Sequence, residues 1–439
     1  MMEAIERLIA LFEIEGQQAY IGEPVSQWSH ASQAAEAALG AGASEAVILS
    51  ALLHDIGHLQ YQHSEKMGRY GVRGHERLGA YYLNTLGFSS VVAELVGLHV
   101  DAKRYRVAKD ASYAGMLSPA SKRTLAFQGG AMTPLECKGF ESSPFFCEAL
   151  QLRQFDEAAK RVQRPQKPLV QFEAILSNHL QAQRLDDRLL LDFHALGFAV
   201  LKRRLPADAI TLLIEEISTL AAHKGPARWM TYFEQSVGGA SMPCRMEYLL
   251  DDAPRLSELL EGPAWLNLAS QCLGEPAVLF KEKINFKLPG GRGFKAHQDA
   301  PAFDLFGQSA HVTIMLSLDP STLENGCLEV GQGSGRQRRL PQAADLTLDA
   351  QTEASLSWMP QPTDIGDVMI FDGFLPHRSG ANQTNLPRRA IYATYAKARE
   401  GDHRETYFRR KRVEFPPEQE RVPGRDYPGG VFNVGNPIR

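Results

Sequence analysis

The stretch that decides the N-terminal fold reads SEAVILSALLHDIGHL and covers residues 44–59. Its apolar side chains recur at helical spacing, and His54 and Asp55 lie among them. We expect one helix here, with His58 one turn beyond His54 on the same face. Burying a histidine beside a carboxylate among alanines and leucines is costly unless a partner compensates for the lost solvation. A metal cation is such a partner, so this stretch predicts a helical domain built around a metal site.

More histidines lie close by in the sequence. The chain has 13 of them, and six fall between residues 30 and 99. Further helices are expected over 76–88, 91–100 and 145–162, with a shorter one ending near Asp187. A lone histidine is usually a surface or hydrogen-bonded core residue, but an adjacent His-Asp pair with others around it favours a metal. Two metals with one bridging carboxylate would use His30, His54, His75, His99, Asp55 and Asp156. This nitrogen and oxygen set suits iron or another first-row metal better than magnesium.

Three further blocks accompany these residues: HVDAKRY (99–105), SPASKRTLAFQGG (118–130) and LRQFDEAAK (152–160). Together with the six ligands they resemble the mixed-valent di-iron oxygenases of the HD superfamily, in particular the branch that cleaves 2-amino-1-hydroxyethylphosphonate. The resemblance covers most of residues 15–165. It implies that one iron is held by His30, His54, Asp55 and Asp156. It implies that the other iron is held by Asp55, His75 and His99.

The same resemblance assigns roles beyond the ligands. It implies that Tyr20 and Glu23 gate the open iron position. It implies that the phosphonate group is held by His58, Lys103, Ser121, Thr124 and Arg153. A phosphonate dianion needs cationic and hydroxyl donors, which these side chains supply. The alternative for the two cations is a solvated helix face.

Most HD proteins are hydrolases, so an HD phosphohydrolase that directs metal-activated water at a phosphoester is the main alternative. A sensor domain without catalysis is the other. The HD pair alone does not separate these functions. The complete six-ligand set, together with Tyr20 and Glu23, favours the oxygenase.

From about Leu189 the sequence changes character. We expect strand, turn and helix over 191–222, and then short strands separated by Gly- and Pro-rich turns. Many short strands of this kind predict a sandwich or barrel. The expected domains are therefore 1–187, all-α, and 188–439, mostly β. The expected later strands are 277–288, 311–318, 326–330, 367–373 and 390–397.

A second metal motif lies in GGRGFKAHQDAPAF, residues 290–303. His297 and Asp299 are two residues apart, so on extended backbone they point to one face. With His377 they form the two-histidine, one-carboxylate triad of non-haem Fe(II) oxygenases. Arg388, eleven residues after His377, can pair bidentately with the far carboxylate of 2-oxoglutarate. The adjacent Arg389 is the alternative anchor.

The spacing H-x-S-x-x-N-x-T over 377–384, with ENGCLEV at 324–330, resembles the phytanoyl-CoA-dioxygenase-like family of Fe(II)/2-oxoglutarate oxygenases. The resemblance covers roughly residues 190–400. It implies a double-stranded β-helix (jelly-roll) fold, iron ligands His297, Asp299 and His377, and 2-oxoglutarate anchored by Arg388. Ser379 and Gln298 are implied as assisting residues. The alternative is a jelly roll without metal that serves only in interactions. The basic run at 409–412 is expected to be solvated.

The fusion suggests consecutive steps. We expect the C-terminal domain to hydroxylate C1 of a 2-aminoethylphosphonate-type substrate with 2-oxoglutarate and O₂. The N-terminal domain then cleaves the C–P bond of the 1-hydroxy product to an amino acid and phosphate. The alternative is an HD hydrolase or sensor joined to an oxygenase with an unrelated substrate. A trimethylated amine would call for an aromatic box, and the candidates are Trp229, Tyr232, Phe294, Phe303 and Phe306, although most aromatics at such positions are core.

Composition narrows the remaining classes. The net charge is −4, which favours a small-molecule partner over nucleic acid or an anionic membrane. There is no run of 18 apolar residues, and acidic residues interrupt the N-terminal apolar stretch, as in an amphipathic helix rather than a signal peptide. Five cysteines without a CxxC pair indicate a reducing, cytoplasmic setting. Nothing in the pattern decides the oligomeric state.

Overall fold

The computed structural model describes residues 2–19, 25–162, 168–332, 338–436 and 438. The chain divides into two compact units, residues 1–183 and 184–439. The division falls four residues before the expected boundary at 187. Within the described part, no helix is both long and apolar enough to cross a membrane.

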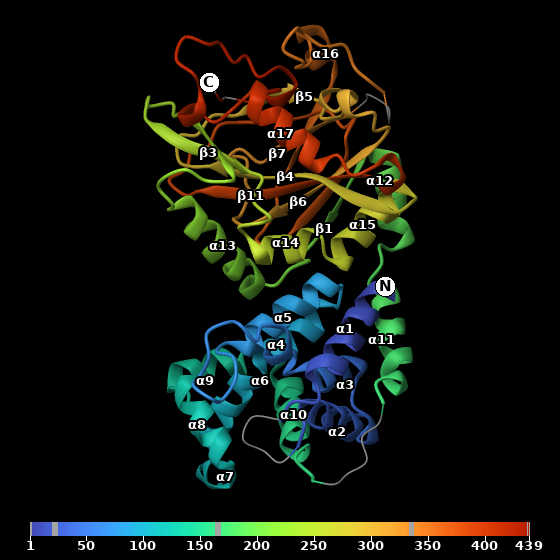
Figure 1. Cartoon of the computed structure of the whole chain (residues 1–439), viewed down its shortest axis with the longest axis vertical. Helices are drawn as coiled ribbons and strands as arrows, with labels where there is room; N and C mark the ends of the chain where they lie inside the picture. Colours follow the sequence, from blue (N-terminus) through green and yellow to red (C-terminus); the bar gives the residue numbers. More distant parts are fainter. Residues whose placement is uncertain (1, 20–24, 163–167, 333–337, 437, 439) are drawn as a thin grey trace. The chain divides into compact units, whose positions relative to one another are not determined.

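The first unit is helical throughout its described part (Figure 1). The pairs α5 with α6 and α2 with α3 pack most extensively, and α10 packs on α2, α3 and α6. Serine side chains cap the central helices: Ser44 accepts a hydrogen bond at the start of α3, and Ser89 does so at the start of α6. The helices are α1 (Met2–Glu15), α2 (Gln27–Gly40), α3 (Glu45–Leu53), α4 (Ile56–Gln60), α5 (His75–Leu86), α6 (Ser90–Lys109), α7 (Ala111–Met116), α8 (Pro119–Phe127), α9 (Pro134–Glu141), α10 (Phe146–Ala158) and α11 (Val170–Ala182).

The prediction of one unbroken helix over 44–59 is wrong. α3 ends at Leu53 and α4 begins at Ile56, so His54 and Asp55 form the link between them. Asp55 has φ −99° and ψ 9°, outside the helical region. Because of this break, His54 and His58 do not lie on one face of a single helix, and their side chains have different neighbours. The backbone of α5 approaches closely here, because a Cβ at Gly57 would lie 2.1 Å from the carbonyl oxygen of His75.

The second unit is a sandwich of two antiparallel sheets. One sheet has the order β1-β9-β6-β11-β4-β3-β2, and the other has the order β5-β10-β7-β8. A core cluster joins Met315 and Phe371 of the first sheet to Leu328 and Val330 of the second. The strands are β1 (Phe198–Leu201), β2 (Met230–Gln235), β3 (Ser241–Glu247), β4 (Ala277–Lys287), β5 (Phe294–His297), β6 (His311–Ser317), β7 (Leu328–Gln332), β8 (Ser357–Gln361), β9 (Val368–Asp372), β10 (His377–Ser379) and β11 (Arg388–Lys397).

This arrangement confirms the strand-rich sandwich and has the two facing sheets that a double-stranded β-helix requires. The unit also has helices: α12 (Asp187–Leu196), α13 (Ala207–Ala221), α14 (Pro254–Leu260), α15 (Pro263–Leu273), α16 (Ala350–Ser355) and α17 (Arg404–Glu414). Short 3₁₀ turns follow the strands at Ala300–Ala302, Asp304–Phe306 and Ala398–Glu400, and others lie at Glu418–Glu420 and Gly430–Phe432.

Two local expectations for this unit are wrong in part. Residues 191–196, expected as strand, belong to helix α12, because Asp186 caps its start and Gly197, at φ 83°, ends it. The basic run 409–412 lies in α17, where Arg409 is exposed and Arg410 and Arg412 are partly exposed as expected, but Lys411 is fully buried. Lys411 is held by Glu247, whose carboxylate oxygen lies 2.5 Å from its Nζ.

Candidate functional site

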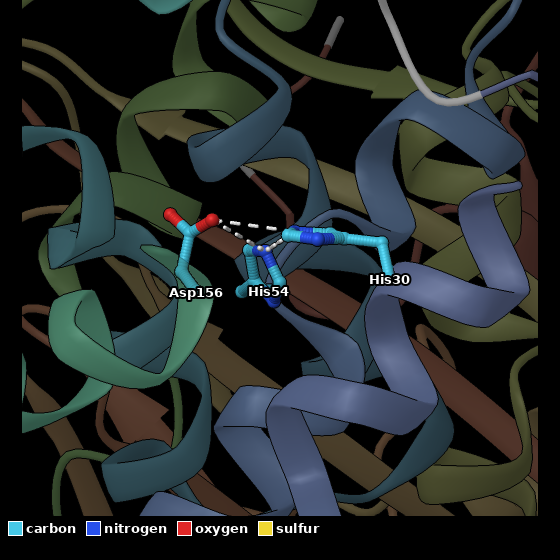
Figure 2. A group of neighbouring side chains, drawn as sticks. All are labelled: His30, His54 and Asp156. Atoms are coloured by element: carbon cyan, nitrogen blue, oxygen red, sulfur yellow. Dashed lines mark hydrogen bonds and ion pairs between the residues drawn. The ribbon is translucent and has the colours of Figure 1, made fainter. Parts of the chain in front are cut away.

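Three segments of the helical unit bring His30, His54 and Asp156 together, as Figure 2 shows. His30 comes from α2, His54 from the end of α3, and Asp156 from α10. The Nε2 atoms of the two histidines are 3.0 Å apart, and Asp156 Oδ1 lies 3.2 Å from Nε2 of His30. All three side chains are buried.

A second group lies beside the first and contains Asp55, His75 and His99. His75 begins α5 and His99 lies on α6. Their Nε2 atoms are 3.1 Å apart, and Asp55 Oδ1 lies 3.4 Å from the first and 3.7 Å from the second.

Asp55 connects the two groups. Its Oδ1 faces His75 and His99, while its Oδ2 lies 3.3 Å from Nε2 of His54 and 3.7 Å from Nε2 of His30. One carboxylate therefore offers an oxygen to each group. This is the geometry of a bridging ligand between two metal ions, and the break between α3 and α4 makes it possible.

The histidine tautomers favour metal binding. Nδ1 of His30, His54 and His99 donates to the backbone carbonyls of Ala159, Ala51 and Val96, at 3.0, 2.9 and 2.7 Å. Because Nδ1 carries the proton, the Nε2 lone pairs point into the cluster. Oδ2 of Asp55 and Oδ1 of Asp156 are buried and accept no hydrogen bond from the described residues. Converging lone pairs and orphaned carboxylate oxygens fit a site for two first-row metal ions.

The charges of the cluster support the same conclusion. Against the effect of burial, His54 holds the pKa of Asp55 well below its usual value, and Arg153 does the same for Asp156. Burial, followed by His75, lowers the pKa of His99 to about 3, so this ring is neutral. Although burial opposes it, Asp55 and Asp156 raise the pKa of His54 to about 9. The two carboxylates thus make this position favourable for a cation.

A pocket opens beside the second group. All five residues with a predicted phosphonate-binding role line this pocket. Further lining residues that the sequence reasoning did not single out are Met67, Ala120, Gln128 and Lys160. The five predicted residues are His58, Lys103, Ser121, Thr124 and Arg153. Gln128 and Lys160 lie within two of the sequence blocks quoted above, so their place in those blocks could have identified them as pocket residues.

Several pocket side chains are oriented as donors. His58 stacks on His75, and its Nδ1 accepts from the backbone N–H of Val72 at 3.0 Å, so its proton is on Nε2. Burial, followed by Arg153, lowers the pKa of Lys103 to about 7. Lys103 Nζ donates to Thr124 Oγ1 at 3.3 Å.

Arg153 connects the pocket to the metal cluster. Its Nη1 donates to Asp156 Oδ2, and its Nε donates to Glu157 Oε1 and to the Tyr113 hydroxyl, both at 2.9 Å. Its Nη2 is buried and donates no hydrogen bond within the described part of the chain. Tyr20 and Glu23 lie outside the described residues.

The second unit holds a separate triad of His297, Asp299 and His377. His297 on β5 is the register partner of His377 on β10, and their ring centroids are 4.2 Å apart. Asp299 follows β5, and its Oδ1 is 3.8 Å from Nε2 of His297. The two Nδ1 atoms donate to the carbonyls of Lys295 and Leu375, at 2.8 and 3.0 Å, so both Nε2 lone pairs are available to a metal. Burial lowers the pKa of both histidines, that of His297 to about 3.

The two arginines after the triad differ in their partners. Arg389 pairs with both carboxylate oxygens of Asp319 at 2.8 Å. Arg388 is buried, and it donates to the hydroxyls of Ser321 and Tyr392, with no acidic partner within the described residues. Arg388 is therefore the arginine whose charge is left for an anionic cofactor.

The assisting residues have different surroundings. Ser379 Oγ accepts from Lys287 Nζ at 2.6 Å, on the strand that carries His377. The side-chain amide of Gln298 forms hydrogen bonds with backbone groups. It donates to the carbonyls of Arg338 and Phe374 and accepts from the N–H of Leu340. It thus positions the loop around the triad. The aromatic candidates Tyr232, Phe303 and Phe306 are core residues, packed with Phe280 and Tyr407.

The fold and the triad define an oxygenase that depends on iron and 2-oxoglutarate, joined to a helical HD domain. The family model "HD domain" matches residues 28–134, and the model "Phytanoyl-CoA dioxygenase (PhyH)" matches residues 193–390. The chain belongs to the phytanoyl-CoA dioxygenase family, and the predicted fusion with an HD domain is confirmed.

Three relatives share substantial sequence with this chain. The 2-aminoethylphosphonate dioxygenase of Uncultured bacterium HF130_AEPn_1 is 45% identical over 219 residues, which is 49% of this chain and 84% of the relative. The methylphosphonate hydroxylase of Gimesia maris is 39% identical over 46% of this chain and 76% of the relative. The hydroxymethylphosphonate dioxygenase of Gimesia maris is 40% identical over 35% of this chain and 79% of the relative.

Proposed function

We propose that the protein is a bifunctional oxygenase of phosphonate catabolism. The C-terminal unit hydroxylates C1 of a 2-aminoethylphosphonate-type substrate with 2-oxoglutarate and O₂. The N-terminal unit then cleaves the C–P bond of the 1-hydroxy product with a second O₂, which yields an amino acid and phosphate. The observation that carries the proposal is the presence of two complete and separate ligand sets, one of them beside a pocket of anion-binding side chains.

The names of the relatives support this order. They include enzymes named for the oxidation of 2-aminoethylphosphonate and methylphosphonate, and one named for a hydroxymethylphosphonate. The last name describes a phosphonate that already carries a hydroxyl group. These names support the proposal that the two units carry out consecutive oxidations of one carbon.

In the C-terminal unit, His297, Asp299 and His377 would hold one Fe(II) on one face and leave the other positions open. Arg388 would bind the far carboxylate of 2-oxoglutarate, because its guanidinium is buried and has no acidic partner among the residues that the structure describes. The hydroxyls of Ser321 and Tyr392 hold that guanidinium in place. Bound iron would supply activation of O₂.

In the N-terminal unit, Asp55 would bridge two irons held by the remaining ligands of the two groups. The phosphonate would lie in the adjoining pocket, where His58 Nε2, Lys103 and Arg153 present donors. A dianion there stabilises the charged form of Lys103 against the effect of burial. Arg153 contacts Asp156 as well, so it aligns the substrate with the metal cluster.

Phosphorus NMR of a reaction mixture tests the proposal. Purified protein loaded with Fe(II) should convert 2-aminoethylphosphonate to inorganic phosphate, and the conversion should stop when either 2-oxoglutarate or O₂ is omitted. Supplying the 1-hydroxy compound should remove the need for 2-oxoglutarate but not for O₂. Phosphate release from a phosphoester under anaerobic conditions would instead establish the phosphohydrolase alternative.

A further inference from the structure

The inner face of β4 carries a row of lysines. In the register with β11, Lys287 pairs with Arg388 and Lys283 pairs with Tyr392. Because side chains alternate along a strand, Lys281 and Lys283 lie on the same face as Lys287 and the proposed 2-oxoglutarate anchor. This face of the sheet therefore holds several cations near the triad.

The three lysines differ in their partners. Lys287 Nζ donates to Ser379 Oγ and to the carbonyls of Gly326 and Gly380. Within the described residues, no acceptor or carboxylate lies within bonding distance of Lys281 or Lys283. The nearest partners are aromatic: Lys281 Nζ is 4.4 Å from the ring centroid of Phe303, and Lys283 Nζ is 5.3 Å from that of Tyr392. Two inward-facing ammonium groups thus make no direct ion pair within the described part of the chain.

A third cation joins them from the neighbouring strand. Arg245 on β3 is 3% exposed, and its Nη1 donates to Glu247 at 2.9 Å. Its Nε and Nη2 are buried and make no hydrogen bond with the described residues. Glu247 is shared with Lys411, whose Nζ binds its other oxygen. Glu247 is therefore shared by Arg245 and Lys411, and it is also the register partner of Lys283, so this one carboxylate faces several cations.

The cations act on one another and lie near the triad. Burial, followed by the charge of Lys281, lowers the pKa of Lys283 to about 7, and Arg245 adds to the effect. Geometry places Lys281 near the triad, because its Nζ lies over the ring of Phe303. Phe303 ends the short 3₁₀ turn Ala300–Ala302 that begins at the ligand Asp299. Buried like charges are costly unless an anion joins them.

We propose that Lys281, Lys283 and Arg245 form the subsite that binds the phosphonate dianion of the substrate in the C-terminal unit. This inference rests on the proposed function and adds to it a binding site for the first substrate. The unpaired nitrogens of Arg245 and the two lysines supply the donors that phosphonate oxygens accept. The site lies beside the iron ligand Asp299, so it holds the carbon next to phosphorus near the metal.

The co-substrate is an unsuitable ligand for the whole cluster. Its anchor Arg388 is the register partner of Lys287, and Lys281 lies six residues further along β4. That separation is about 20 Å along the strand. The five-carbon chain of 2-oxoglutarate is only about 6 Å long. One molecule held by Arg388 therefore covers only part of this row, which leaves Lys281 at the far end for a second anion.

Binding measurements test the subsite independently of turnover. The full chain carries a phosphonate pocket in each unit, so the background is the double variant K103A/R153A, which disables the N-terminal pocket. Calorimetric titration of this Fe(II)-loaded protein, kept anaerobic, uses ethylphosphonate and 2-oxoglutarate as probes. We expect ethylphosphonate to bind, and Lys281→Met to weaken that binding at least tenfold while 2-oxoglutarate binding stays within twofold. If ethylphosphonate does not bind the background protein, or if Lys281→Met weakens both ligands equally, the subsite is wrong.

A stability comparison separates this role from a structural one. Lys281→Met removes a buried charge that makes no direct ion pair within the described residues, so the ligand-free variant should have the same or a higher Tm. The matched control is Lys411→Met, which leaves Glu247 with one partner fewer and should lower the Tm. A Tm loss for Lys281→Met as large as that of the control, with ethylphosphonate binding unchanged, would show that Lys281 serves packing alone. If the subsite binds ethylphosphonate but 2-aminoethylphosphonate does not stimulate 2-oxoglutarate turnover, the proposed function fails and the anion site remains.

Discussion

The Nε2 atoms of His30 and His54 lie 3.0 Å apart, while each ring donates its Nδ1 proton to a backbone carbonyl. Two neutral imidazoles in this arrangement direct their lone pairs at each other. The contact is stable only with a cation between them, either a proton or a metal ion. The Nε2 atoms of His75 and His99 are likewise only 3.1 Å apart, although of these two rings only His99 donates its Nδ1 proton to a backbone carbonyl among the described residues. Asp55 connects the two pairs.

The first prediction concerns metal content. The wild-type chain should bind three irons, two in the helical unit and one in the β unit. Asp55→Asn keeps the size of the side chain but removes the charge that the bridging position requires. We expect this variant to lose the iron of the helical unit and to retain substrate-stimulated 2-oxoglutarate turnover. Elemental analysis gives the metal count, and a single zinc in the helical unit would contradict the di-iron assignment.

The second prediction concerns the N-terminal pocket. Lys103→Ala removes a charge-assisted hydrogen bond worth about 1.5–3 kcal/mol, so KM for the 1-hydroxyphosphonate should rise by about tenfold or more. Lys122→Ala is the matched control, because its Nζ is exposed and donates to the carbonyl of Gly115. Kinetics of phosphate release measure both variants. Equal KM values for Lys103→Ala and the wild type would place Lys103 outside the binding site.

The third prediction distinguishes the two adjacent arginines. Arg388→Ala should raise KM for 2-oxoglutarate by at least about tenfold, since it removes a buried anchor with two donors. Arg389→Ala should leave that KM unchanged and cost about 1 kcal/mol or less of stability, because it only breaks the partly exposed pair with Asp319. The KM for 2-oxoglutarate of each variant is obtained from 2-oxoglutarate consumption at saturating phosphonate, and it shows which arginine is the anchor. The reverse result would make Arg389 the anchor.

Much of both sites could be predicted from residue types and spacing. His297 and Asp299 share a face because of strand alternation, and His377 follows in a block with its own motif. The choice between Arg388 and Arg389 was open because it depends on which of them faces inward. That depends on the register of β11 against β4, which is set by tertiary pairing.

Other features depend on contacts between distant segments. The helix over 44–59 breaks at Asp55 because this carboxylate faces two histidine groups, which apolar periodicity does not reveal. Lys411 lies in a basic run that looks solvated, and only the fold brings Glu247 to it. Gln298 stands inside the iron motif, yet its amide is used by backbone groups at positions 338, 340 and 374. Local sequence carries no signal for such long-range partners.

The most direct test of the account is the division of labour between the two units, measured with the variants His297→Ala and His75→Ala. His297→Ala should stop consumption of 2-aminoethylphosphonate but still release phosphate from the 1-hydroxy compound, because its di-iron ligands lie in the other unit. His75→Ala should consume 2-oxoglutarate and O₂, accumulate the 1-hydroxy compound and release no phosphate. Phosphorus NMR resolves substrate, intermediate and phosphate in one spectrum. If His297→Ala, with its fold intact, also failed to release phosphate from the 1-hydroxy compound, the two-site account would be contradicted.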